Sequence, residues 1–251
     1  MGAWTLVDAG ALTPAGNMRL DLGLLGCSID GCRAEPLVRV YGWDPPALSV
    51  GAKLELPDGV TERCAAAGVA VVRRATGGGC VLHDGDVTYS VVAPESGRSV
   101  LEAYRWVARG LIAGLALLGL EATVAEHPTS GRPLDCFAAA TGADLELGGR
   151  KICGSAQVRR RGWFLQHGSV PISDIRPKTA GLLGGTVQPK STCLERERPG
   201  TTWNQVATAL IAGFSAAWGA EPHRRPPEPR EWGCGASEQQ LSGVEEGPRE
   251  M

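Results

Sequence analysis

The sequence predicts an α+β fold, a two-layer α/β domain in which a mixed, largely antiparallel sheet packs against helices. Three observations lead to this prediction. Several short runs have the alternation and composition of strands. Three or four longer segments repeat apolar residues at helical spacing. Residues 144–172 read as successive strands joined by tight turns.

The N-terminal part of the chain predicts one helix followed by two strands. In residues 16–26, apolar side chains recur on one face of a helix. Residues 37–43 alternate as a strand does, and Pro45 and Pro46 end that strand. Residues 47–51 are predicted to form a second short strand.

The central part predicts a helix–strand unit and then a hairpin. Residues 60–74 read as a short helix that turns into a strand near residues 69–72. Residues 80–94 read as a β-hairpin with its turn near residues 84–86, because "VTYSVV" has strand composition and a Gly marks the turn.

Two further helices are indicated by their first residues. In residues 99–120, Ser99 is followed three positions later by Glu102, the signature of a capping box. The apolar residues of this segment recur at helical spacing. The same capping signature begins the last predicted helix, residues 201–219.

The remaining segments are a β-meander and a tail. Residues 144–172 predict the meander, with a hairpin turn at Gly148–Gly149. From residue 221 onward the composition shifts to Pro, Gly and Glu, which is typical of a segment without a packed core. We therefore expect one packed domain over residues 1–220 and a flexible tail over residues 221–251.

Composition and charge exclude several protein classes. The 251 residues carry a formal net charge of −2, without the basic excess of a general nucleic-acid binder. No secretory signal begins the chain, and its most apolar run, residues 111–120, is too short to span a membrane. The cysteines form no CxxC pair, so we expect no metal site. We expect a cytoplasmic protein with reduced cysteines and no nucleic-acid or membrane partner.

A glycine-rich loop lies in "VRRATGGGCVLHDG", residues 72–85. It lacks the Lys and the following helix of a P-loop, and it also departs from the Rossmann pattern. Two interpretations remain, a tight turn without a ligand or a cradle whose backbone N–H groups face a carbonyl or anionic oxygen. Arg73 and Arg74, directly before the glycines, favour an anionic or polar ligand.

This loop is one of several blocks that follow one another in a familiar order. The blocks are "GNMRLD" (16–21), "YGWDPPALSVG" (41–51), "RRATGGGCVLHDGDVTYSV" (73–91) and "GRKICGSAQVRRRGWFLQHGSV" (149–170). Together they resemble the biotin/lipoate protein ligase (BPL/LPL) superfamily. Within it they are most similar to the cysteine-dependent octanoyltransferases of the LipM type. The likeness covers roughly residues 3–218.

The resemblance implies a fold like class II biotin/lipoate ligase catalytic domains over residues 1–220, with an elongated apolar pocket for an acyl group. It places Lys151 at the reacting carbonyl and Cys136 as the nucleophile. The substrate-binding residues that it implies are Arg73, Arg74, Thr76, Gly77, Gly78, Gly79, His83, Gly154, Ser155, Ala156, Gln157, His167 and Gly168. Each of the two histidines is either a proton shuttle or a satisfied structural residue. Cys80 and Cys153 are expected to be small apolar fillers near the pocket.

The implied activity is octanoyl transfer in protein lipoylation. Cys136 would take octanoyl from octanoyl-acyl-carrier protein as a thioester, and a lysine of a lipoyl domain or of the glycine-cleavage H protein would accept it. Lys151 and the backbone N–H groups around Gly77–Gly79 and Gly154–Ser155 would stabilise the oxyanion. This chemistry needs no cofactor.

Three alternatives remain open. A lipoate–protein ligase of this superfamily would use ATP and Mg²⁺, and the glycine loop would face an adenylate. An amidotransferase would move octanoyl from H protein to another lipoyl domain. In a different class, a non-catalytic carrier-domain binder or a redox-sensing protein would not use Cys136 and Lys151 for catalysis.

Overall fold

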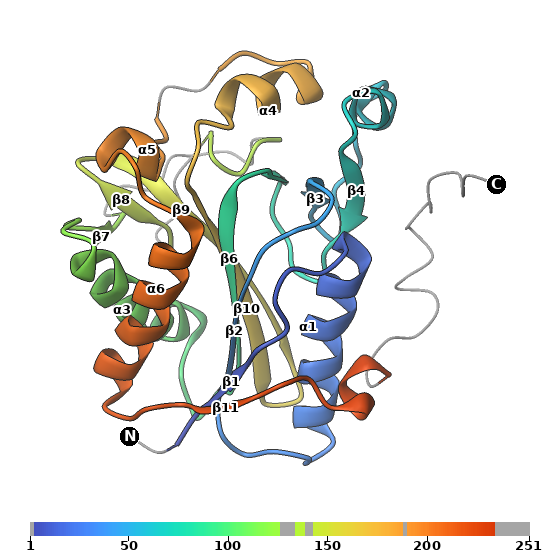
Figure 1. Ribbon diagram of the computed structural model, residues 1–251. Helices are drawn as coiled ribbons and strands as arrows, with labels where there is room; N and C mark the ends of the chain where they lie inside the picture. The colour runs from blue at the N-terminus through green and yellow to red at the C-terminus, as the bar shows by residue number, and fades with distance from the viewer. Residues whose placement is uncertain (1–2, 126–133, 139–142, 188–189, 234–251) are drawn as a thin grey trace.

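The computed structural model describes residues 3–125, 134–138, 143–187 and 190–233. A large mixed sheet forms the centre of the molecule, and helices lie on both of its faces (Figure 1). Across this sheet, the strands are β11 (His223–Arg225), β1 (Thr5–Val7), β2 (Leu37–Tyr41), β6 (Asp86–Pro94), β10 (Trp163–Pro171), β9 (Arg150–Arg160), β8 (Leu145–Leu147) and β7 (Thr123–Val124).

The pairing in the large sheet confirms the predicted mixed, largely antiparallel character. Strands β11, β1 and β2 are parallel to one another. From β2 through β6, β10, β9 and β8 to β7, each neighbouring pair is antiparallel. The predicted meander corresponds to β8, β9 and β10, and both glycines of its first turn have positive φ, as a tight hairpin requires.

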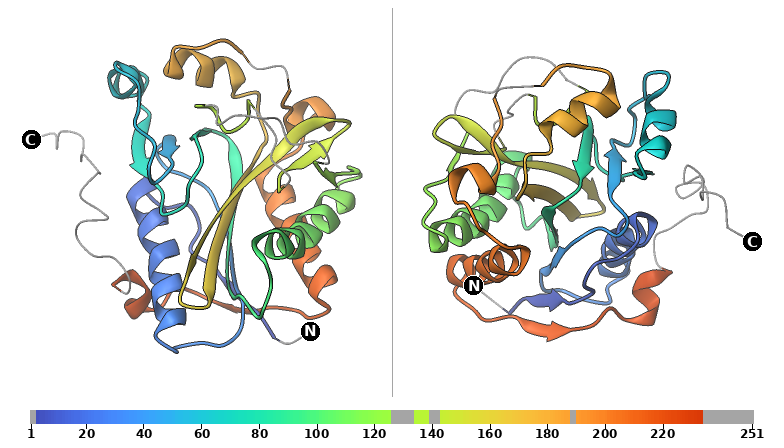
Figure 2. Two further views of the ribbon diagram at one scale, coloured as in Figure 1. Left: turned by 180° about the vertical axis from the view of Figure 1, so that it is seen from behind. Right: turned by 45° about the horizontal axis from the view of Figure 1, so that its top comes forward.

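The helices are α1 (Pro14–Ile29), α2 (Val60–Ala66), α3 (Val100–Leu117), α4 (Arg176–Leu183), α5 (Leu194–Glu197) and α6 (Trp203–Trp218), and η1 (Pro229–Trp232) is a 3-10 turn. Helices α3 and α6 cover one face of the large sheet and α1 covers the other (Figure 2). Because β6 alternates, its Val91 contributes to the first cluster and its Val92 to the second. Helix α1 therefore adds a layer to the two that were predicted.

The predicted helix starts are confirmed at α3 and α6. Ser99 Oγ accepts from the backbone N–H of Glu102, and the Glu102 carboxylate accepts from the backbone N–H of Ser99 at 2.8 Å. Thr202 and Gln205 form the same box at α6. The two helices then pack closely because glycines face each other: a Cβ on Gly213 would lie 2.2 Å from the backbone nitrogen of Gly114.

A second, three-stranded sheet consists of β4 (Ala70–Arg73), β3 (Ala47–Val50) and β5 (Cys80–His83), in that order. This sheet shows that the predicted hairpin over residues 80–94 is wrong. Strand β5 pairs with β3, whereas β6 pairs with β2 and β10. Both strands and the turn exist, with Gly85 at φ +81°. Strand β6 is buried along nearly its whole length, and it satisfies its backbone between two neighbours in the large sheet.

The C-terminal part of the described chain packs on the domain. Strand β11 adds a parallel edge to β1, and η1 lies against α1, where a Cβ on Gly23 would overlap the carbonyl of Glu231. Glu231 is buried and binds Arg225. Residues 221–233, which the composition assigned to the tail, thus lie against the domain, and residues 234–251 fall outside the described residues.

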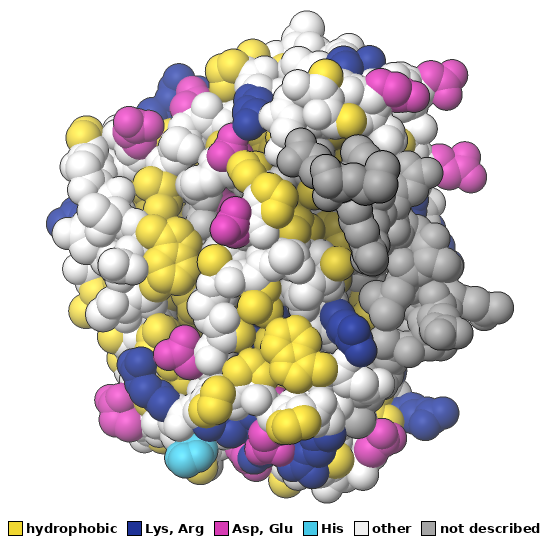
Figure 3. Space-filling view, turned by 45° about the vertical axis from the view of Figure 1, so that its right-hand side comes forward, with side chains coloured by type: hydrophobic (Ala, Val, Ile, Leu, Met, Phe, Trp, Pro, Cys, Tyr) yellow, Lys and Arg dark blue, Asp and Glu magenta, His cyan; other side chains and the backbone are white. Residues whose placement is uncertain are grey.

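No helix in the described part of the chain is both long and apolar enough to cross a lipid bilayer. On the face shown in Figure 3, acidic and basic side chains are interspersed, and neither sign of charge forms a continuous patch. This surface agrees with the near-neutral net charge of the sequence.

Candidate active site

A cavity of about 150 Å³ lies where the two sheets meet, with walls from β3, β5, β6, β9 and β10. Both predicted catalytic residues, Cys136 and Lys151, line it. The predicted binding residues that also line it are Arg74, Gly78, Gly79, His83, Gly154, Ser155, Ala156, His167 and Gly168. Four do not: Arg73, Thr76, Gly77 and Gln157. The structure thus brings together residues from each of the four sequence blocks. It also brings in Cys136, which lies in the loop between the third and fourth blocks.

Cys136 is held against the glycine loop and β5. Its backbone N–H donates to the carbonyl of Cys80 at 2.9 Å, and the neighbouring Asp135 forms a parallel bridge with Cys80. The side chain of Cys136 is half-buried. A Cβ placed on Gly78 would lie 3.4 Å from Cys136 Sγ, so the sulfur packs directly on the glycine backbone. The thiol is therefore both accessible and fixed in position.

Lys151 is buried beside Cys136 in an ion pair with Asp144. Lys151 Nζ lies 2.6 Å from the carbonyl oxygen of Cys136 and 2.7 Å from Asp144 Oδ2. Lys151 is 3% exposed and Asp144 1% exposed. A buried ammonium at this position fixes a positive charge next to the thiol-bearing loop, where a low dielectric strengthens its action on nearby charge.

Asp144 is a site residue that the sequence reasoning missed. Its other oxygen accepts from the backbone N–H of Ser155 at 3.1 Å. That N–H, which was expected to stabilise an oxyanion, is therefore engaged by a carboxylate. The available signal was the spacing in "DLELGGRK": the hairpin turn folds β8 back on β9, which brings an acid near the lysine.

Two glycines of the predicted site are explained by close contacts. A Cβ on Gly154 would lie 3.1 Å from Lys151 Cε, so this glycine makes room for the lysine side chain. A Cβ on Gly168 would lie 2.5 Å from the carbonyl oxygen of Gly154 and 2.7 Å from Tyr89 Cε1. Beside the glycine loop, a Cβ on Gly51, the residue after β3, would overlap the carbonyl of Gly78. Side chains at these positions would displace the cavity walls.

Two further cysteines near the cavity are buried among apolar side chains. Along β5, Val81 and His83 line the cavity, while Cys80 and Leu82 face a separate hydrophobic cluster. Burial raises the pKa of Cys80 to about 12. Burial likewise raises the pKa of Cys153 to about 12, and its side chain belongs to the main hydrophobic core. Both cysteines thus pack among apolar side chains, and Cys80 faces away from the cavity.

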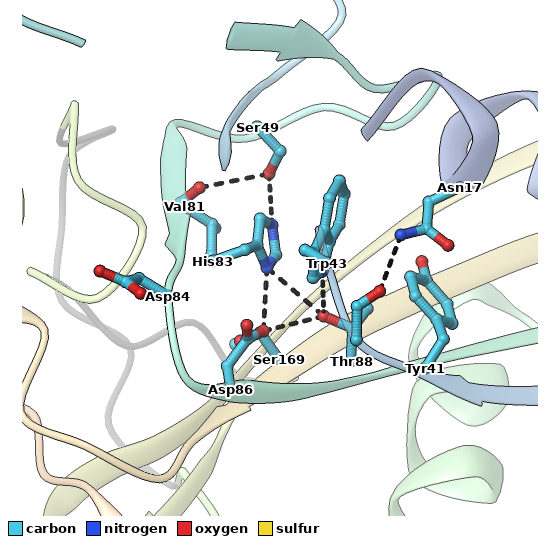
Figure 4. Close-up of polar contacts among 12 residues, drawn as sticks. Asn17, Tyr41, Trp43, Ser49, Val81, His83, Asp84, Asp86, Thr88 and Ser169 are labelled. Carbon is cyan, nitrogen blue, oxygen red and sulfur yellow. Dashed lines mark hydrogen bonds and ion pairs between the residues drawn. The ribbon is translucent and has the colours of Figure 1, made fainter. Parts of the chain in front are cut away.

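His83 is held from three sides (Figure 4). Its Nδ1 lies 2.9 Å from Asp86 Oδ2 and its Nε2 lies 2.8 Å from Ser49 Oγ. The ring stacks on Trp43, with centroids 4.0 Å apart. Asp86 also accepts from Thr88 and Ser169 hydroxyls. Burial alone would raise the pKa of Asp86, but His83 and these hydroxyls hold it below its usual value. Asp86 follows His83 by three residues in "HDGD", a signal that the sequence reasoning did not use.

His167, which also lines the cavity, is held in the same manner. Its Nε2 lies 2.6 Å from Thr76 Oγ1 and its Nδ1 3.3 Å from Asp21 Oδ2. Asp21, on α1, also forms an ion pair with buried Arg39. Burial lowers the pKa of His167 despite the carboxylate. Both ring nitrogens of each histidine are thus engaged, which favours the structural alternative over a freely exchanging proton shuttle.

The low pKa of His167 predicts how stability depends on pH. Below the pKa of an unfolded histidine, about 6.5, the unfolded chain binds a proton that buried His167 resists. The free energy of unfolding contributed by this residue is therefore present above that pH and is lost as the pH falls through it.

Urea unfolding at pH 5.0 and pH 7.5 measures this effect. The drop in unfolding free energy toward pH 5.0 is expected to be smaller in His167→Gln than in wild type. His223→Gln, at an exposed position on β11, is the matched control and should keep the wild-type drop. An equal drop in all three proteins would show that His167 is not the titrating group.

Two predicted binding residues serve the protein's own backbone and side chains. Arg73 Nη1 donates to the carbonyls of Gly51 and Leu54, both at 2.8 Å, and so holds the segment after β3. Gln157 Nε2 donates to Gln166 Oε1 across β9 and β10. Neither side chain is directed to the cavity. Within the described ranges, no group of three or more His, Cys, Asp or Glu side chains is placed to hold a metal ion.

Comparison with known proteins identifies similar chains. The family model of the lipoyl protein ligase A/B catalytic domain matches residues 13–215. The octanoyltransferase LipM of Geobacillus kaustophilus is 41% identical over 180 residues, which is 66% of this chain and 64% of that protein. The aligned part thus spans just under two thirds of that relative. The LipM octanoyltransferase of Kyrpidia tusciae is 36% identical over 259 residues, 92% of this chain and 93% of that protein.

Solved structures share the fold. A lipoate protein ligase of T. acidophilum, determined with bound lipoic acid, superposes with a TM-score of 0.72 over 96% of this chain and 94% of that chain. A lipoate-protein ligase A bound with ATP gives a TM-score of 0.71 over 96% of this chain and 93% of that chain. Each is 22% identical to this chain, so this likeness bears on the fold alone.

Proposed function

The chain belongs to the lipoyl protein ligase A/B catalytic-domain family, and we propose that it is a cysteine-dependent octanoyltransferase of protein lipoylation. Its relatives of the LipM type are named for this activity. The observation that carries the proposal is the position of Cys136. Its thiol lies on the cavity wall, and its own carbonyl is bound by the buried Lys151. An ATP-dependent ligase forms an acyl-adenylate and has no need of such a nucleophile.

The first step forms an octanoyl-enzyme. The Cys136 thiolate attacks the carbonyl carbon of octanoyl-acyl-carrier protein, a new C–S bond forms, and the C–S bond to the carrier thiol breaks. The departing thiolate takes the proton that the Cys136 thiol released. Lys151, held as an ammonium by Asp144, stabilises the negative charge that develops on the carbonyl oxygen.

The second step transfers octanoyl to protein. The ε-amine of a lysine on a lipoyl domain or on the glycine-cleavage H protein attacks the thioester, an amide bond forms, and the bond to Cys136 breaks. The proton lost by the amine returns to the sulfur. No metal or nucleotide takes part in either step. The apolar part of the cavity wall, including Met18, Trp43 and Val81, is suited to the acyl chain.

A transfer assay without nucleotide tests this proposal. The protein is incubated with octanoyl-carrier protein and an apo lipoyl domain or apo H protein, without ATP, and the acceptor mass is measured. We expect one octanoyl group to appear on the acceptor. Octanoylation only from octanoate plus ATP would identify a ligase, transfer only from octanoyl-H protein would identify an amidotransferase, and no transfer from any donor would overturn an enzymatic function.

A further inference from the structure

Arg74 lies in the cavity wall with all its donors used by neutral oxygens. Its guanidinium makes five described hydrogen bonds, which join it to Thr76 Oγ1, Ser49 O, Ser49 Oγ, Gly77 O and Gly79 O. The residue is only 5% exposed. Each acceptor is uncharged, so the positive charge is solvated by dipoles and remains unneutralised by direct contact in the described part of the chain.

The guanidinium and the proposed nucleophile both lie close to one glycine, Gly78. A Cβ placed on Gly78 would lie 3.2 Å from Arg74 Nη2 and 3.4 Å from Cys136 Sγ. The two atoms are therefore no more than about 7 Å apart. The absence of a side chain at Gly78, whose φ is +99°, permits this approach. By binding the carbonyls before and after Gly78, Arg74 fixes the backbone on which the sulfur packs.

Two hydrogen-bonded arrays of side chains each end at Arg74. In the first, Asp86 binds His83 and His83 binds Ser49, whose hydroxyl accepts from Arg74 Nη1 at 3.1 Å. In the second, Asp21 binds His167, and His167 binds Thr76, whose hydroxyl lies 3.4 Å from Arg74 Nε. The two histidines thus orient two hydroxyls toward one cation.

The charges around the cavity make Arg74 distinctive. Lys151 is paired with Asp144, and Arg39 with Asp21. The remaining carboxylate of the arrays, Asp86, is separated from Arg74 by both His83 and Ser49. Negative charge that develops at Cys136 therefore meets a fixed, unpaired guanidinium close by, in a region of low dielectric.

We infer that Arg74 is a positioning residue for acyl transfer. This inference rests on the octanoyltransferase function proposed above. Arg74 holds the glycine loop against Cys136 Sγ and supplies a preorganised positive charge to the sulfur and the oxyanion. The two Asp–His–hydroxyl arrays set its orientation. Arg74 does not bind the substrate as an anion receptor, because its donors are already used.

Single-turnover acylation tests this inference. The rate of formation of the octanoyl-enzyme is followed by intact mass over a range of octanoyl-carrier protein concentrations, for wild type, Arg74→Ala and Arg74→Lys. We expect the maximal rate to fall by about 10²-fold in Arg74→Ala, with a smaller loss in Arg74→Lys and a half-saturating donor concentration within about threefold of wild type. Arg159→Ala is the matched control, since Arg159 also binds two backbone carbonyls but lies outside the cavity lining.

Chemical rescue separates charge from packing. Millimolar guanidinium is expected to raise the maximal acylation rate of Arg74→Ala at least tenfold. Urea, a neutral molecule of the same shape, should not raise it. A rescue by urea equal to that by guanidinium would overturn the electrostatic part of the inference. If guanidinium does not raise the rate of Arg74→Ala, the electrostatic part of the inference is likewise overturned.

Failure of the inference about Arg74 can be distinguished from failure of the proposed octanoyltransferase function. If wild type forms no octanoyl adduct, the proposed function fails. If wild type is acylated and Arg74→Ala is acylated at the same rate, the inference about Arg74 is overturned. Should Arg74→Ala not fold, the Ser49→Ala/Thr76→Val protein keeps the cation but removes both hydroxyls. It must show a reduced maximal rate with unchanged half-saturation, and a wild-type rate would overturn the inference.

Discussion

Lys151→Met is expected to lower the rate of octanoyl transfer by about 10²–10³-fold, because it removes the Lys151 ammonium beside the Cys136 loop. Methionine matches the aliphatic length of lysine, so the packing of the side chain beside Gly154 is kept, while the cation–π contact of the ammonium with Phe137 is lost. The loss should appear in the maximal rate, since the charge acts on the oxyanion that forms in the transition state.

The same substitution also affects stability, and the two effects can be separated. Removing Lys151 leaves Asp144 buried without its cation, which typically costs about 3–5 kcal/mol of unfolding free energy. In the Asp144→Asn/Lys151→Met protein both charges are absent, and the amide still accepts from the Ser155 N–H. The double variant should recover most of the lost stability but none of the activity.

Urea denaturation and the transfer assay on the same four proteins complete this cycle. Wild type, each single variant and the double variant are compared. Recovery of activity together with stability in the double variant would show that the lysine has only a structural role. Loss of activity in a protein of near wild-type stability is the result expected here.

Cys136→Ser is expected to lower octanoyl transfer by at least about 10³-fold, because a hydroxyl is a far weaker nucleophile than a thiolate and an oxygen ester transfers its acyl group to an amine more slowly. The change is nearly isosteric at a half-buried position, so the packing on Gly78 should be kept. The assay is the transfer of octanoyl to an apo lipoyl domain or H protein without ATP.

Cysteine variants elsewhere serve as controls for Cys136. Cys32→Ser changes another half-buried thiol outside the cavity lining and should transfer at the wild-type rate. Cys80→Ala and Cys153→Ala test the two buried thiols whose pKa is raised to about 12 by burial. Loss of transfer in Cys80→Ala or Cys153→Ala at retained stability, with transfer intact in Cys136→Ser, would reassign the nucleophile.

Local patterns predicted the elements of this fold better than their pairing. The capping boxes at Ser99 and Thr202 and the turn at Gly148–Gly149 depend on residues close in sequence, and each is present. The partners of β5 depend on segments far away in sequence. A strand–turn–strand pattern therefore predicted a hairpin, where the structure divides the two strands between two sheets.

The candidate site shows the same limit. The resemblance placed Cys136 and Lys151 in one cavity, although nothing in their separation of fifteen positions requires proximity. It did not reveal Asp144, because a single acid in an alternating strand region has no distinctive pattern until the hairpin register is known. Nor does the pair Arg73–Arg74 show which arginine faces inward. Strand alternation separates them, and only Arg74 lines the cavity.

The histidine arrays were also beyond the sequence. Asp86 lies close to His83 in the chain, but Asp21, on helix α1, is far from His167 in sequence. A histidine in a motif can act on a substrate or on its own protein, and only the partners of both ring nitrogens distinguish the two. Here each histidine binds a hydroxyl, of Ser49 or Thr76, that in turn accepts a hydrogen bond from Arg74.

The most direct test of the central claim is the intact mass of the protein after incubation with octanoyl-acyl-carrier protein alone. Wild type is expected to gain one octanoyl group in a linkage that hydroxylamine cleaves, as it cleaves thioesters. Cys136→Ala is expected to keep its unmodified mass. An absence of adduct on wild type, or an adduct that persists in Cys136→Ala, would contradict transfer through a Cys136 thioester.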